Sequence, residues 1–403
     1  MQTPSPDRLL IPLLSACNFV IGAGAFVIIG LLEPLGADIG RSAAEAGQLM
    51  TVYAVAYAVL SPLMVSLSGR IGRRRVLAAA MTIFAIAAAL AALAPGFGTL
   101  SLSRVVAAAG AGIFTPVAAA VAAGLYPVAQ RARVLAAVFF GLTMAQVLGV
   151  PAGSFIAYSI GWRWAFALVV LLCLPCIVLI WRRVPAGLTF QPVSLSDLAA
   201  TLAEGRTMLA IGFTGTFLGS MYVLYTYVAP LLSETMGYGR DGITFILVMF
   251  GVGAVGGNIL GGFLADRLGW RATLTAICIT QVILMPVFSL LPFSPVLLAL
   301  LAVIWAVSGW SFMAGQQMRL IGFAGPRAPV VLALNAAAIY VGAAVGSALG
   351  GFVVAQFGLT ALGLFAGAAA LLALLHLLLS VRRAPCPQTA SAAENGAAPA
   401  APS

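Results

Sequence analysis

Long runs without a charged residue dominate this chain and restrict it to the interior of a lipid bilayer. A helix that crosses a bilayer needs roughly 20 mostly apolar residues. The run 272–318 is too long for one helix and is divided at Pro292 and Pro295, and the run 328–381 is divided near Gly358. The runs therefore predict twelve spanning helices at 9–34, 45–68, 74–95, 98–124, 132–158, 163–181, 207–232, 242–264, 271–291, 295–316, 328–354 and 359–381.

The composition supports a membrane protein with many spans. Only 7% of the 403 residues are charged and 62% are hydrophobic, with a mean hydropathy of +1.11, whereas soluble domains carry about 25% charged residues. The net charge of +10 would suit nucleic acid, but the arginines cluster between the apolar runs. Lipid and membrane topology explain that placement better, so we expect no nucleic-acid partner. The sequence predicts an all-α membrane fold.

The arginines also predict which side of the membrane each loop faces. With the N-terminus inside, the cytoplasmic segments hold sixteen arginines and the opposite side holds only Arg41, Arg163 and Arg240. Cytoplasmic loops of membrane proteins carry an excess of basic residues. Both termini are therefore predicted to be cytoplasmic. The sixteen are Arg8, Arg70, Arg73, Arg74, Arg75, Arg131, Arg133, Arg182, Arg183, Arg206, Arg267, Arg271, Arg319, Arg327, Arg382 and Arg383.

The two halves of the chain repeat each other at an offset of 197 residues. LSGRIGRRRVL at 67–77 matches LADRLGWRATL at 264–274, and LGVPAGSFIAYSIG at 148–161 matches VGSALGGFVVAQFG at 345–358. Two distant segments with one offset indicate parallel repeats, as in one known transporter architecture. The predicted organisation is a six-helix bundle at 1–181, a cytoplasmic linker at 182–206, a second six-helix bundle at 207–383 and a disordered tail at 384–403.

The chain resembles the major facilitator superfamily, in its twelve-span drug/proton antiporter branch near the arabinose-efflux-permease type. That family has the loop pattern G-x-L-A-D-R-x-G-R-[RK]-x-x-L. The second repeat keeps most of this pattern, while the first has Gly69 in place of the aspartate. The matching residues are Arg70, Gly72 and Arg74 in the first repeat, and Gly262, Asp266, Arg267, Gly269 and Arg271 in the second. The resemblance implies that these loops latch the inner ends of the halves during gating.

The helix at 132–158 carries a second point of resemblance. Gly149, Pro151 and Gly153 are similar to the G-P-x-x-G motif of antiporters, with a valine inserted before the proline. This likeness implies secondary active transport, namely proton-coupled efflux of a small neutral or amphipathic solute such as a drug, sugar or nucleoside. Proton-linked uptake or facilitated diffusion of a small metabolite is the alternative, and a non-transporting membrane sensor is a more remote one.

Two ionisable residues are candidates for proton coupling because charges inside a membrane are costly. Arg104 lies about five residues into its helix, where it either senses charge in a cavity or extends to the membrane surface. Glu33 lies near the outer end of the first helix, where it either pairs with Arg104 or is a solvated carboxylate. Both interpretations stay open for each residue.

Uncharged polar and aromatic residues are candidates for lining a cavity between the halves. Tyr222 and Tyr225 lie three apart on one helix and so share a face, and with Trp305 they predict an aromatic wall. Asn258 and Asn335 are expected to form interhelical hydrogen bonds instead. The remaining cavity candidates are Asn18, Gln146 and Tyr340.

Other classes of protein find little support in the sequence. An ATP-driven pump needs a G-x4-G-K-[ST] loop, and the chain contains no lysine. A membrane enzyme needs clustered acids, histidines or a nucleophile, but His376, the one histidine, has no acid nearby. Cys173 and Cys176 are expected to be packing residues. We therefore expect a monomeric, non-enzymatic protein of the bacterial inner membrane. Its predicted partners are lipid, protons and a small solute, with the proton gradient as energy source and no cofactor or metal.

Overall fold

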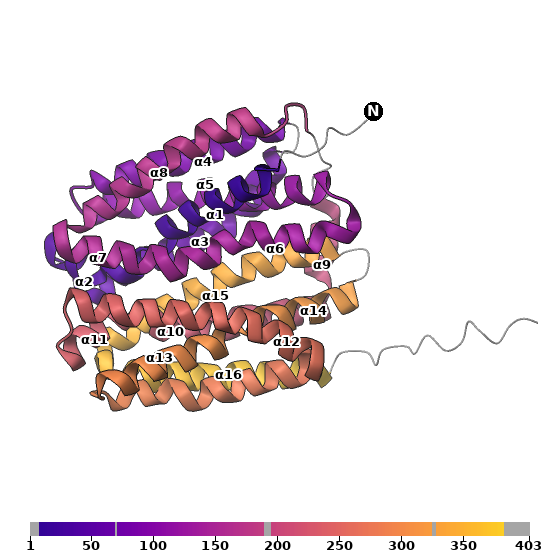
Figure 1. Cartoon of the computed structure of the whole chain (residues 1–403). Coiled ribbons are helices and arrows are strands. Elements are labelled where there is room, and N and C mark those ends of the chain that lie inside the picture. Colours follow the sequence, from indigo (N-terminus) through magenta and orange to yellow (C-terminus); the bar gives the residue numbers. More distant parts are fainter. Residues whose placement is uncertain (1–7, 69–70, 189–194, 325–327, 383–403) are drawn as a thin grey trace, which may run out of the picture.

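The structure is a bundle of long helices in two groups, each contributed by one half of the chain (Figure 1). A computed structural model describes residues 8–68, 71–188, 195–324 and 328–382. We call residues 8–183 the first half and residues 205–382 the second half. In Figure 1 the first half, indigo to magenta, lies above the second half, orange to yellow.

Each half is a series of antiparallel helices joined by short connections. The first half contains α1 (Leu10–Phe26), α2 (Ile28–Ile39), α3 (Ala43–Leu67), α4 (Arg73–Ala92), α5 (Phe97–Leu125), α6 (Val128–Met144), η2 (Ala145–Gly149), α7 (Val150–Ile160) and α8 (Trp162–Arg183). After α9 (Leu195–Ala203), the second half contains α10 (Gly205–Tyr225), α11 (Val228–Met236), α12 (Arg240–Val287), η3 (Phe288–Leu290), α13 (Pro295–Trp310), α14 (Phe312–Ala324), α15 (Ala328–Phe357), η5 (Leu359–Ala361) and α16 (Leu362–Arg382).

Eleven helical stretches in the described residues are long and apolar enough to cross a membrane. One of them, Arg240–Leu290, covers two of the twelve predicted spans. Its helix α12 is bent at Gly269, whose φ of 74° and ψ of 160° lie outside the helical region. Glycine tolerates this positive φ because it lacks a Cβ. The bend at Gly269 therefore separates the two spans that α12 covers.

The structure corrects several predicted boundaries. The helix predicted to end at residue 316 continues through α14 to Ala324, so Arg319 is buried in the bundle and does not lie in a loop. The predicted polar linker contains the short helix α9, and α10 begins at Gly205. The predicted disordered tail lies outside the described residues.

The 197-residue repeat is visible in the backbone. The first span is interrupted between α1 and α2, and its counterpart is interrupted between α10 and α11. The second helix of each pair ends at a left-handed glycine, Gly40 or Gly237, and both have a φ of 64°. Such glycines commonly end helices. The end of the bundle that holds these glycines is called the α11 end below, and the opposite end, beside α9 in Figure 1, is called the α9 end.

The glycines of the repeat allow helix backbones to touch. A Cβ added at Gly149 would overlap Ala23 of α1, and one added at the equivalent Gly346 would overlap the carbonyl of Gly219 in α10. A second ladder, Gly253 and Gly257 of α12, faces the backbone of α13 in the same way. Small residues are favoured at such crossings because lipid provides no hydrophobic force between helices.

Replacing Gly346 by valine should destabilise the protein by about 1–3 kcal/mol, the usual cost of overpacking. The thermal midpoint of the purified protein in detergent would measure the loss. Gly98→Ala is the matched control, because a Cβ there meets nothing within 4 Å. An equal midpoint for Gly346→Val and the wild type would contradict this account of the crossing.

Candidate functional site

A buried arginine joins two helices of the first half. Arg104 of α5 is 2% exposed, and its Nη1 and Nη2 donate to the carbonyl oxygens of Gly24 and Ala25 at 2.9 and 2.7 Å. Those carbonyls belong to the last turn of α1, where carbonyl groups lack intrahelical partners and attract cations. The interruption after Phe26 therefore provides the acceptors that a buried guanidinium needs. Arg104 is accordingly a buried residue and does not extend to the membrane surface.

Tyrosines extend from Arg104 into the second half. The guanidinium lies 4.8 Å from the ring centre of Tyr53 in α3, a cation–π contact. Tyr53 and Tyr57 both contact Tyr340 of α15, and Tyr57 stacks on it with ring centres 3.6 Å apart. These rings are buried, and the Tyr53 hydroxyl has no hydrogen-bond partner within the described structure. The centre of the molecule is therefore lined by aromatic rings that carry hydroxyl groups.

A small polar network lies next to these rings. Asn18 of α1 donates to the Val138 carbonyl at 3.1 Å and accepts from Thr115 of α5 at 2.9 Å. The Thr115 hydroxyl in turn interacts with Tyr57. This network joins three spans of the first half, and Tyr57 connects it to Tyr340 of the second half. Polar groups of this kind can exchange partners with an uncharged solute.

The helix that carries Gly149, Pro151 and Gly153 is locally widened. Residues 145–149 form the π-helical turn η2, which ends two residues before Pro151. Proline lacks an N–H and disturbs the helix before it, and π-turns are frequent at functional sites. Gln146 lies in this turn, is buried, and has an amide oxygen without a partner in the described part of the chain. The neighbouring Val147 backbone faces Gly251 of α12, across the boundary between the halves.

Glu33 links the two halves at the α11 end. Its carboxylate accepts from Tyr158 of α7 at 2.8 Å and from Ser233 of α11 at 2.9 Å. Tyr158 belongs to the first half and Ser233 to the second. Because Arg104 binds the α1 carbonyls, the structure does not bring Glu33 and Arg104 together. Glu33 is half-buried and has defined partners, so it is not a freely solvated carboxylate either.

Other contacts close the same end. Tyr227 donates to the carbonyl of Ser347 at 3.0 Å, and Ser347 Oγ donates to the carbonyl of Gly47 in α3 at 3.1 Å. A Cβ at Gly47 would overlap the Tyr227 ring. Arg240 Nη1 reaches Ser159 at 3.3 Å. These contacts join the two halves at the α11 end.

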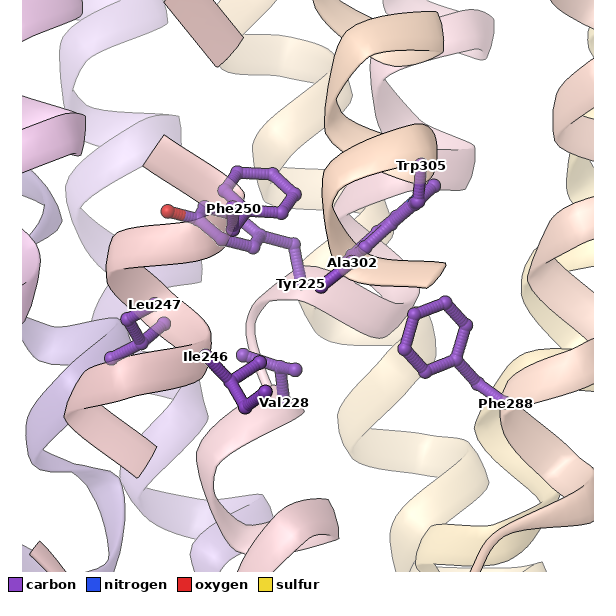
Figure 2. A pocket seen from close by; sticks show the side chains of 8 residues that line it. All are labelled: Tyr225, Val228, Ile246, Leu247, Phe250, Phe288, Ala302 and Trp305. Atoms are coloured by element: carbon purple, nitrogen blue, oxygen red, sulfur yellow. The ribbon is translucent and has the colours of Figure 1, made fainter. Parts of the chain in front are cut away.

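The predicted aromatic wall forms within the second half. Tyr225 and Trp305 contact each other with ring centres 6.2 Å apart, and Phe250 stacks on Tyr225 at 4.4 Å. Figure 2 shows these rings around a small apolar pocket. The pocket has room for about one water molecule. Its other lining residues are Val228, Ile246, Leu247, Phe288 and Ala302. Tyr222 contacts Tyr225 and also lies near Tyr340.

Within the described residues, no ion pair latches the two loops of the repeat together. Asp266 is exposed and has no ion pair there. Arg267 lies over the Phe263 ring, and Arg271 lies 5.8 Å from the Trp270 ring centre. A Cβ added at Gly262 would meet nothing within 4 Å. Arg70 falls outside the described residues, whereas Gly72 precedes α4 and Arg74 contacts Trp181.

Two of the polar side chains have different outcomes. Asn335 accepts from Thr214 of α10, as predicted for an interhelical bond. The prediction for Asn258 is wrong, because its amide donates to Ala254 of its own helix at 3.1 Å. An asparagine facing its own preceding turn satisfies itself there.

His376, Cys173 and Cys176 have packing roles. His376 contacts the Leu209 carbonyl, Thr216 and the Phe213 ring. Cys173 and Cys176 are buried free thiols, as expected for packing residues.

Sequence reasoning missed four residues of this site: Tyr53, Tyr57, Tyr158 and Ser233. Tyr53 and Tyr57 lie four apart and share one helix face, which is a signal that the sequence did contain. The other two become important only through contact with Glu33, which depends on how the halves dock.

The chain was compared with families and with known proteins. The family model of the Major Facilitator Superfamily matches residues 14–328. The inner membrane transport protein YdhP of Escherichia coli (strain K12) is 32% identical over 368 residues, covering 91% of this chain and 94% of that protein. A chloramphenicol resistance protein of Streptomyces lividans is 32% identical over 342 residues, covering 83% and 86%.

Solved structures have the same fold. A partially occluded, inward-open structure of the E. coli xylose transporter XylE gives a TM-score of 0.73 at 17% identity, covering 92% of this chain and 96% of that chain. An inward-facing bacterial homologue of the lysosomal transporter Spinster also gives 0.73, at 18% identity, covering 95% and 96%.

Replacing Arg104 by glutamine should reduce the stability of the purified protein. The change leaves the carbonyls of Gly24 and Ala25 without their donors, and each such buried loss costs about 1–3 kcal/mol. Arg104→Lys should recover only part of the loss, since an ammonium is a poor substitute for a planar fork. Thermal unfolding measures both, with the exposed Arg206→Gln as control. A midpoint for Arg104→Gln equal to that of the control would contradict the role assigned to this contact.

Proposed function

This chain belongs to the Major Facilitator Superfamily, and we propose that it exports a small neutral or amphipathic solute from the cell in exchange for protons. The twelve predicted spans then form two bundles, residues 1–181 and 207–383, with the solute bound between them. Both termini and the α9 end face the cytoplasm. The protein performs no covalent chemistry in this proposal.

The proposed substrate class rests on the mostly uncharged side chains at the centre of the molecule. Arg104 donates to two backbone carbonyls, so part of its guanidinium is engaged within the protein. Tyr53 lies over this guanidinium, and Tyr57 and Asn18 belong to the adjoining rings and polar network. Apolar surfaces with a few polar groups suit uncharged, amphipathic ligands. The likeness to a chloramphenicol resistance protein is consistent with this class.

Glu33 is proposed to couple protons to the opening of the α11 end. As a carboxylate it accepts from both Tyr158 and Ser233 and so holds the halves together. A protonated carboxyl loses acceptor capacity and becomes partly a donor, which weakens this link. Proton arrival from outside would therefore favour opening. Arg104 is proposed to stabilise the interrupted α1 that leads into the Glu33 helix.

The loop residues Arg70, Gly72, Arg74, Gly262, Asp266, Arg267, Gly269 and Arg271 are proposed to act in the opposite state. The structure described here is closed at the α11 end, and Asp266 has no ion pair among the described residues. Closing the α9 end would bring the Asp266 carboxylate towards arginines on other helices. The two ends would then be held alternately.

Proton-linked uptake is the alternative, and vesicle transport separates it from efflux. Inverted membrane vesicles that contain the protein should accumulate labelled chloramphenicol when acidified inside by respiration, and an uncoupler should abolish the accumulation. Vesicles without the protein provide the background. Accumulation only in right-side-out vesicles would support uptake, and accumulation that survives the uncoupler would contradict proton coupling.

Replacing Glu33 by glutamine should uncouple transport from the proton gradient. Glutamine retains an acceptor but cannot take up a proton, so we expect solute exchange to continue while gradient-driven accumulation falls at least about tenfold, equivalent to about 1.4 kcal/mol. Counterflow and driven uptake in reconstituted vesicles measure the two activities.

Glu234→Gln is the matched control, because Glu234 is an exposed carboxylate on the same helix as Ser233. Equal driven accumulation in Glu33→Gln and the wild type would exclude Glu33 as the coupling group.

A further inference from the structure

The first turn of α4 carries an unusual concentration of positive charge. It begins with Arg73, Arg74 and Arg75 and contains no acidic residue, and Gly72 before it supplies no side-chain cap. Helix N-termini favour anions and disfavour cations. No acidic residue occurs between Glu45 and Asp197 in the sequence. The charge at this turn is therefore not balanced by the neighbouring spans of the first half.

The end of α8 lies beside this turn and adds to the charge. Arg74 lies 4.8 Å from the ring centre of Trp181 and donates to its carbonyl at 3.4 Å. Arg182, the next residue, is exposed. In the described part of the chain, Arg74, Arg75 and Arg182 form no ion pair. The contact with Trp181 holds Arg74 at the end of α8, where Arg182 is the next residue in the chain.

The arginines at the α11 end behave differently. Arg41 pairs with Glu45, Arg163 with Asp38, and Arg240 with Asp241. Each is neutralised by a carboxylate of the protein. Arg74, Arg75 and Arg182, by contrast, have no carboxylate partner among the described residues and are open to an anion from outside the protein.

Two exposed apolar stripes lead away from these arginines. On α8 the residues Leu171, Leu174, Val178 and Trp181 recur at helical spacing and are 63%, 52%, 49% and 50% exposed. On α4 the exposed residues continue from Arg75 to Ala79, Thr82 and Ile86. The helices α4 and α8 pack side by side, and the Arg74–Trp181 contact joins the charged ends of the two stripes. This is the shape of a lipid, with tails on the stripes and a phosphate at the arginines.

We propose that the α4–α8 face binds an anionic phospholipid, with the phosphate held by Arg74, Arg75 and Arg182 and the acyl chains lying along the two stripes. Trp181 lies at the boundary between the two parts, where tryptophans are enriched in membrane proteins. Basic residues between helices near the cytoplasmic surface are known to bind anionic head groups. A soluble phosphate would satisfy the charges but would not use the apolar face.

Spin-labelled lipid tests the proposal on the full-length protein. The protein is placed in phosphatidylcholine nanodiscs with a trace of spin-labelled phosphatidylglycerol or phosphatidylcholine. The motionally restricted fraction gives the preference for the anionic lipid. We expect that preference to fall about fivefold for each arginine removed at low ionic strength, and hence most strongly in the double variant Arg75→Gln/Arg182→Gln. High salt should reduce it in the wild type.

Two variants control for general charge and for folding. Arg8→Gln/Arg206→Gln removes the same number of exposed arginines at the α9 end, outside the cluster, and should keep the preference. Arg75→Lys/Arg182→Lys keeps the charge and should restore most of it.

Equal loss in the two glutamine pairs would reduce the effect to surface charge and overturn the site, as would no loss in either. Replacing chloride by inorganic phosphate at equal ionic strength should leave the preference unchanged. Displacement of the lipid by phosphate would assign the cluster to the free anion and overturn the lipid proposal.

Discussion

Backbone groups inside a bilayer must find their hydrogen-bond partners within the protein, and this structure depends on how one interrupted helix meets that demand. The first span ends as α1 at Phe26 and starts again as α2 at Ile28. Its carbonyls at Gly24 and Ala25 are satisfied by Arg104, and they in turn give the buried guanidinium hydrogen-bond acceptors. The helix α2 continues this span and carries Glu33 to the boundary with the second half.

Much of the fold follows directly from the pattern of charge and glycine. The uncharged runs predict the spans to within a few residues, because a charge inside lipid is costly enough to mark each end. The 197-residue repeat anticipates paired glycines such as Gly149 and Gly346, since a missing Cβ is what close helix crossings require. Arg319 escaped the rule because it is buried against aromatic rings and a serine, and these partners are invisible in a linear pattern.

The candidate site was less predictable, for a physical reason. Tyr225 and Trp305, which were predicted to lie in one aromatic wall, contact each other, and both belong to one half. The partners of Glu33 lie on α7 and α11 in different halves, and no local periodicity encodes how the halves dock. Asn258 shows the reverse error, since a polar side chain next to small residues can turn back on its own helix. Contacts within one half can therefore be predicted from the sequence, whereas contacts across the boundary between the halves need the assembled structure.

The packing of Tyr227 against Gly47 restricts how the two halves can separate. A rigid phenol ring occupies space that only the absent Cβ of Gly47 leaves free, and its hydroxyl is fixed by the Ser347 carbonyl. Packed interfaces of this kind are bistable and do not deform continuously. Separation of the halves at this end would therefore require the Tyr227 ring to leave its place beside Gly47.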